Sequence, residues 1–282
     1  MRKCFLIFIN LLFIFSAHAE EDPTKWTNYS SKWFFSEIKS EKSSNTEFKK
    51  SDYLLINSDN TFEYNISKKN LFAKRYEDVI ATTLESTTPQ ELLAKKLKIN
   101  KKTYPDLIAD ISLSVPDDLC IIECNNDQRL LAASVCSPSY WNIKSKIGKS
   151  LKNIHKPVKS LNEKIGNPIE KFINNAPLDQ PFLRENWFIH GDDQRMHLTT
   201  EGYPNGSVEN WIVRSERETL CKFSKDYSLF AINVRFQKLS SILMFDDAIT
   251  GLKRSLEGMD QKEIDYFGGN KKVEKICDFI AS

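Results

Sequence analysis

The stretch WIVRSERETLCKFSKDYSLFAINVRF, residues Trp211–Phe236, decides the fold because it predicts two consecutive strands. Side chains alternate between two faces over Trp211–Leu220 and again over Leu229–Phe236, which is the period of a β-strand. We interpret the resulting sheet as antiparallel, apolar on the face behind and charged on the face in front. The pattern favours a charged face in water, since solvated faces are common in antiparallel sheets; a polar pocket is the alternative.

The two faces can be read from the sequence. On the first strand, the charged face carries Ile212, Arg214, Glu216, Glu218 and Leu220. On the second strand, the apolar face carries Phe230, Ile232, Val234 and Phe236.

The chain before and after this stretch mixes helical and strand periods. Strands are predicted at 119–122 and 130–135, joined by a turn at 125–127, and at 186–190. A capping box at Thr88–Glu91 predicts the start of a helix. Further helices are predicted at 67–85, 106–115, 138–146, 158–173, 239–256 and 273–280. The fold class is therefore α+β, an antiparallel sheet flanked by helices in a single domain over 67–282, after a polar N-terminal extension at 20–66.

The N-terminus has the features of a secretory signal peptide. Arg2 and Lys3 precede an apolar run over 4–15, and Ala17-His18-Ala19 has the small-residue pattern of a cleavage site. The run is short for a membrane span, although an uncleaved anchor is the alternative. We therefore expect export to the periplasm or the exterior after removal of residues 1–19, with no membrane span left in the mature chain.

Charge and cysteine content narrow the class of protein further. Cleavage removes two of the 40 basic residues and leaves 38, which equals the 38 acidic residues. A chain without net charge has no global field to attract nucleic acid, so we expect no nucleic-acid partner. Five of the six cysteines remain, and several lie in apolar runs, which predicts buried thiols with at most one or two disulfides.

Few motifs of known chemistry occur in the sequence. Phosphate-binding glycine loops, HExxH zinc motifs and the CxxCH motif of covalent heme attachment do not occur. The mature chain contains three histidines, at 155, 190 and 197. His155 is either a metal ligand or a polar residue beside a turn, and Asp192-Asp193 is interpreted as a turn rather than a metal site.

Three blocks in the same order resemble the heme-dependent oxidative N-demethylase family. The first block spans 117–158 and contains V-C-x-P-S-x-W followed by K-x-G-x-x-L-x-x-I-H-x-P-V, with matches at Val135, Cys136, Pro138, Ser139, Trp141, Lys146, Gly148, Leu151, Ile154, His155, Pro157 and Val158. The second block matches at Arg184, Asn186, Trp187 and Ile189. The third block matches at Arg214, Glu216, Arg217, Thr219, Leu220, Ile232 and Arg235.

The resemblance implies a PAS-like domain that binds heme b noncovalently. The family demethylates secondary or tertiary amines with dioxygen, releases formaldehyde and receives electrons from partner subunits with flavin and iron–sulfur centres. The resemblance implies that His155 is the axial ligand of the heme iron, that Arg217 and Trp141 also bind the cofactor, and that Glu216 and Arg214 are catalytic.

The chain also departs from the family pattern. Glu218 stands where the pattern has Gln, Lys159 stands where it has Pro, and export would separate the chain from cytosolic reductases. The electron donor is therefore unknown, and a small amine is the expected substrate. A noncatalytic heme or small-ligand binding module is one alternative function. A secreted structural or interaction protein is another.

Overall fold

The computed structural model describes residues 36–37, 61–125, 127–156, 167–199 and 202–281. Its centre is a seven-stranded antiparallel sheet in the order β1-β5-β6-β7-β3-β4-β2. The strands are β1 Ser36–Glu37, β2 Ile80–Thr82, β3 Asp118–Glu123, β4 Leu130–Ser134, β5 Pro181–His190, β6 Ile212–Lys222 and β7 Tyr227–Lys238. The α+β antiparallel prediction is confirmed, and the order β4-β3-β7-β6-β5 is the PAS-like arrangement that the resemblance implies.

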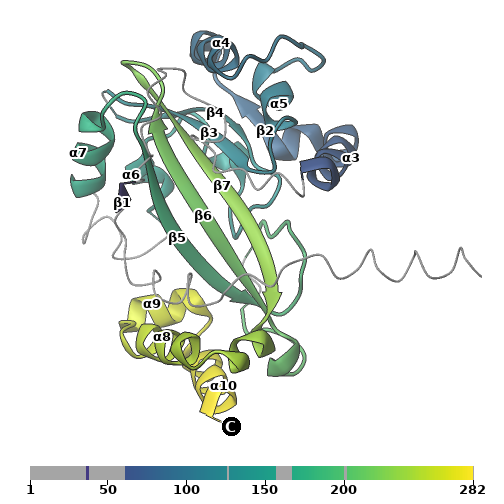
Figure 1. Cartoon of the computed structure of the whole chain (residues 1–282), viewed down its shortest axis with the longest axis vertical. Coiled ribbons are helices and arrows are strands. Elements are labelled where there is room, and N and C mark those ends of the chain that lie inside the picture. The colour runs from purple at the N-terminus through teal and green to yellow at the C-terminus, as the bar shows by residue number, and fades with distance from the viewer. Residues whose placement is uncertain (1–35, 38–60, 126, 157–166, 200–201, 282) are drawn as a thin grey trace, which may run out of the picture.

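Helices surround the long strands β5, β6 and β7 at both ends (Figure 1). Helices α3, α4 and α5 lie at one end, and α8, α9 and α10 lie at the other. The α-helices are α3 Thr61–Val79, α4 Thr87–Lys96, α5 Leu107–Ser112, α6 Leu151–Ile154, α7 Asn167–Asn175, α8 Asp246–Glu257, α9 Gln261–Phe267 and α10 Asn270–Ala281. Short 3₁₀ turns are η2 Leu84–Ser86, η3 Ile143–Ser145, η5 Val208–Asn210 and η6 Leu239–Met244.

Several predicted helices differ from the structure because tertiary pairing overrides local periodicity. The helix predicted over 67–85 begins at Thr61 and ends at Val79, since Ile80–Thr82 pairs with β4 instead. Over 138–146 only Ile143–Ser145 is helical, and Ser139 forms a bridge to His197. The predicted capping box at Thr88 is wrong, because α4 begins at Thr87 with Ser86 as its N-cap.

The C-terminal helices also divide differently from the prediction. The helix predicted over 239–256 is split into η6 and α8 at Phe245, whose backbone is extended. The sequence reading missed α9, although Asp260 and Glu263 form a complete capping box at its start. The helix predicted over 158–173 lies partly outside the described residues, which contain α7 from Asn167 onward.

The register of β5, β6 and β7 sorts their side chains onto two faces. We call one the site face, defined by Arg184, Asn186, Arg214, Glu216 and Glu218. The other is the back face, defined by Glu185, Trp187, Ser215 and Arg217. Directly paired residues share a face, and Asn186 pairs with Glu216 while Ser215 pairs with Trp187.

The same register corrects the predicted division into a charged front and an apolar back. Phe236, Val234 and Ile232 pair with Arg214, Glu216 and Glu218, so charged and apolar side chains share the site face. Separate apolar clusters cover the two faces. Ile143 and Ile154 pack with Phe230 on the site face, whereas α3, α4 and α5 pack on the back face near β3.

Two further expectations can be compared with the described residues. No helix in the described part of the chain is long and apolar enough to cross a membrane. The signal peptide at 1–19 lies outside the described residues. Cys120, Cys124, Cys136, Cys221 and Cys277 are all free thiols, and the first four are buried, as the apolar runs predicted.

Candidate functional site

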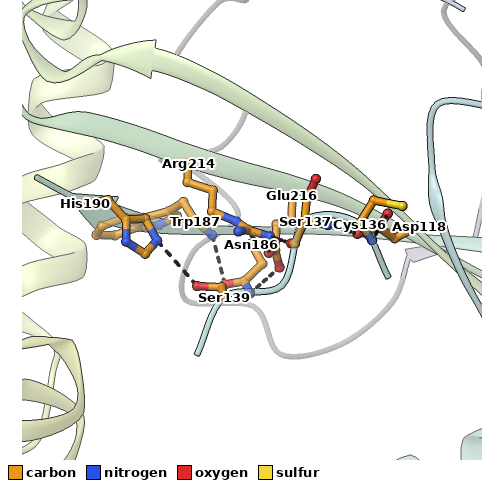
Figure 2. A network of polar contacts seen from close by, with 9 residues as sticks. All are labelled: Asp118, Cys136, Ser137, Ser139, Asn186, Trp187, His190, Arg214 and Glu216. Carbon is orange, nitrogen blue, oxygen red and sulfur yellow. Dashed lines mark hydrogen bonds and ion pairs between the residues drawn. The ribbon is translucent and has the colours of Figure 1, made fainter. Parts of the chain in front are cut away.

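An ion pair between the buried Arg214 and the half-buried Glu216 forms the centre of the site face (Figure 2). Arg214 donates from Nε at 3.1 Å and from Nη2 at 2.7 Å to Glu216 Oε1. Asn186 Nδ2 lies 3.3 Å from the other carboxylate oxygen, Oε2. Arg214 is only 1% exposed, so the interpretation of this face as solvated is wrong. The strand pattern could not show this, because alternation reports which residues share a face and not what covers them.

The loop that follows β4 supplies a second anchor for Arg214. Arg214 Nη2 also donates to the backbone carbonyl of Ser137. Asp118 holds this loop, since its carboxylate accepts hydrogen bonds of 2.8 Å from the backbone N–H groups of Cys136 and Ser137. Burial raises the pKa of Asp118, while Lys68 and the two N–H donors act in the opposite direction. The sequence reading missed Asp118, although a carboxylate at the start of an apolar strand was the available signal.

A second charged pair lies beside the first on the same face. Arg184 on β5 pairs with Glu218 on β6, and Glu218 is 4% exposed. Burial raises the pKa of Glu218 and the nearby Glu216 adds to this, while Arg184 lowers it. Glu218, which departs from the family pattern, therefore provides the charge partner of a largely buried guanidinium group.

His155 lies close enough to Arg184 for the positive charge of the guanidinium group to lower the pKa of the imidazole. Its backbone caps α6, with its N–H donating to Leu151 O at 2.9 Å. Burial, together with the positive charges of Arg184 and Lys146, lowers the pKa of the imidazole to about 4. His155 is thus both the residue that ends a helix and a neutral imidazole at pH 7. A neutral imidazole is the form that binds a metal.

Trp141 belongs to the apolar cover of the site face. It is half-buried and packs against the cluster that contains Cys120, Ile143 and Ile154. Leu151 and Phe230 pack against the same cluster. This apolar surface therefore lies next to the helix that ends at His155.

Arg217 is the predicted site residue that the fold places elsewhere. It lies on the back face, where its Nη2 is 3.7 Å from Asp117 Oδ1. The structure therefore brings Arg214, Glu216, Trp141 and His155 to one face of the sheet and does not bring Arg217 to them. A cofactor-binding role for Arg217 stays a prediction.

A histidine cluster at the end of β5 had no predicted role. The rings of His190 and His197 stack with centroids 4.4 Å apart, and the Tyr140 ring meets both edge-on. Asp192 accepts from the Gln194 N–H at 2.8 Å, which confirms the turn interpretation of Asp192-Asp193. No group of three or more His, Cys, Asp or Glu side chains among the described residues is placed to hold a metal ion.

Fold and site together define an α+β PAS-like domain with a buried polar strip on one face of its sheet. A family model described as haem-dependent oxidative N-demethylase, alpha subunit-like, matches residues 70–277. This span covers most of the chain, so the chain belongs to this family. No curated protein matches the chain significantly.

The residues of the site face fit the haem that the family name implies. Haem iron is held by a protein ligand such as the imidazole of a histidine, and the group also requires an apolar surface for its macrocycle and cationic partners for its propionates. His155 offers a neutral imidazole, and Trp141 and Phe230 belong to the adjacent apolar surface. Arg184 and Lys146 are the positive charges next to the imidazole. The site face therefore offers one histidine, His155, as a ligand for the haem iron.

Proposed function

We propose that this chain is an exported haem-binding domain that demethylates secondary or tertiary amines oxidatively. The observation that carries the proposal is the group formed by the buried Arg214 with the half-buried Glu216 and Asn186. It lies on the sheet face that also holds Arg184, whose charge acts on His155. A solvated face would need no such group. Membership of the haem-dependent family supports the choice of cofactor.

His155 would provide the axial ligand to a noncovalently held haem b. Trp141 and the apolar residues around Ile154 would contact the macrocycle, and Lys146 would balance a propionate charge, since Arg184 is already paired with Glu218. The bound haem would supply activation of dioxygen. The overall reaction joins a methylamine, dioxygen, two electrons and two protons, and yields the demethylated amine, formaldehyde and water.

Glu216 would bind and orient the amine. Arg214 and Asn186 fix one oxygen each of its carboxylate, so the group cannot rotate away from the substrate. Ionised carboxylate oxygens have further lone pairs, which can accept hydrogen bonds from an ammonium group. Arg214 in turn is held by Ser137 O, so the loop after β4 sets the position of the catalytic carboxylate.

The electrons must come from a donor in the compartment where the chain acts. The leader-like N-terminus supports a periplasmic or extracellular location, which requires a donor there in place of cytosolic reductases. N-terminal sequencing of the exported protein tests this part, with a mature start at Glu20 expected. A retained Met1 in the cytosolic fraction would contradict it.

The haem assignment is tested by the absorption spectrum of His155→Ala. The purified mature wild type should show a Soret band, and His155→Ala should abolish or strongly shift it. His190→Ala and His197→Ala are matched controls that should keep it, because these rings stack on each other at the far end of β5. An unchanged spectrum in folded His155→Ala would refute the axial role.

A further inference from the structure

The Arg214 guanidinium has a nitrogen that the fold leaves unused. Its Nε and Nη2 atoms bond Glu216 and Ser137 O, as described above. Its Nη1 atom is buried and has no hydrogen-bond partner among the described residues. A buried donor of a charged group without an acceptor is costly, so such an atom points to a missing ligand.

The charges at Arg214 and Glu216 already balance each other. A simple alkylammonium ion beside Glu216 would add a positive charge close to the guanidinium, in a place with little water to screen it. A ligand with both an ammonium group and a carboxylate would add no net charge. Its ammonium group would bond Glu216, and its carboxylate would give Nη1 the acceptor that it lacks.

We propose that the site face recognises N-methylated amino acids, with Glu216 binding the amino group and Arg214 Nη1 binding the carboxylate. The inference rests on the proposed amine chemistry and narrows its substrate class. One carbon separates the amine from the carboxylate in an α-amino acid, so a single small ligand can reach two residues that are already in contact. Phe188 and Phe236, both half-buried, flank Arg214 in the sheet register and are the side chains that the ligand would displace.

The test compares two ligands that differ in one charge. N,N-dimethylglycine and N,N-dimethylglycinamide are titrated calorimetrically into the haem-loaded mature protein. The carboxylate ligand should bind at least about tenfold more tightly, because a charge-assisted hydrogen bond contributes roughly 1.5–3 kcal/mol and 1.4 kcal/mol is tenfold. Arg214→Lys keeps the positive charge but loses the planar guanidinium group and its Nη1 donor. The variant should therefore bind dimethylglycine no more tightly than its amide.

Arg235→Lys is the matched control, since Arg235 pairs with Glu185 on the back face. It should keep the preference for dimethylglycine. Equal or tighter binding of the amide by wild type would overturn the inference and leave amine recognition intact. Failure of both ligands and of dimethylamine to bind haem-loaded protein would overturn the proposed amine function itself. If Arg214→Lys does not fold, the affinities of wild type for dimethylglycine and for its amide still test whether the carboxylate is recognised.

Discussion

The two faces of strand β6 each carry an arginine next to an acidic partner, but the two pairs differ in geometry. On the site face Arg214 lies 2.7 Å from Glu216, and a second donor, Asn186, holds the other oxygen. On the back face Arg217 lies 3.7 Å from Asp117, beyond hydrogen-bond distance. Burial raises the pKa of Asp117 to about 6, against the opposing charges of Arg217 and Lys68. Residue types alone therefore do not identify a site; the Glu216 carboxylate is held on both oxygens, by Arg214 and by Asn186, whereas Arg217 does not reach hydrogen-bond distance of Asp117.

The largest expected effect is the loss of stability in Arg214→Ala. The substitution removes the charge partner of Glu216, which keeps only Asn186, and leaves the carbonyl of Ser137 without the donor Arg214; breaking such a pair typically costs about 3–5 kcal/mol. Arg217→Ala should cost clearly less at pH 6, because Asp117 can take up a proton and become neutral. Urea unfolding of both variants measures the difference, and equal losses would remove the contrast between the faces.

The next effect is the pH dependence that Asp117 contributes. Its pKa is about 6 in the folded chain, above the ordinary value of 3.8, so the folded state binds more protons between these values. Stability should therefore fall as pH rises from about 4 to about 6, by roughly 3 kcal/mol from this group. Asp117→Asn should flatten that slope in urea titrations across the range. An unchanged slope would show that Asp117 does not titrate as its burial implies.

His155 on the site face should act in the opposite direction. Its pKa is lowered to about 4 from an ordinary 6.5, so the unfolded chain binds more protons in between. Stability of the haem-free protein should be lost as pH falls from about 6.5 to about 4, by roughly 2 kcal/mol for a half-buried ring. His155→Gln should reduce this acid loss, whereas Asp117→Asn should increase the net acid loss. The same sign of change in both variants would contradict the assignment.

The smallest effect is expected at an exposed pair. Arg75 Nε lies 2.9 Å from Asp78 on α3, with the arginine side chain 43% exposed. Water screens such pairs, so Arg75→Ala should change the free energy of unfolding by less than about 0.5 kcal/mol. A loss as large as that of Arg214→Ala would show that short ion-pair distances, and not burial, set the cost.

The strands of the sheet were predicted more accurately than the helices that flank it. Alternation located β6 and β7, and the turn residues located the β3–β4 hairpin. Only the second half of β5 was predicted, at 186–190. The alternation also placed Arg214 and Arg217 on opposite faces. Helix ends were wrong where pairing decided them, as at Ile80, which joins β4 although its helical period continues. Local periodicity cannot report a partner strand that is distant in the chain.

The sequence predicted which residues form the site, but it did not predict that the site face is largely covered by other parts of the chain. The resemblance named Glu216, Arg214 and His155, and the fold brings them to one face. Burial of that face depends on the loop held by Asp118 and on the packing of Ile143 and Ile154, which are non-local. The His190–His197 stack escaped notice for the same reason, since its two rings come from a strand and a later loop.

If the site face is catalytic and the back face is not, the release of formaldehyde should distinguish variants of the two faces. The haem-loaded protein is reduced artificially, supplied with dioxygen and a methylated amine, and compared with Glu216→Gln and with the back-face control Glu185→Gln. We expect formaldehyde from wild type and Glu185→Gln, and a roughly 10²–10⁴-fold lower rate for Glu216→Gln at full haem occupancy. Equal rates in all three proteins would contradict a catalytic role for Glu216. Absence of formaldehyde from wild type with every amine would leave a haem-binding module without this activity.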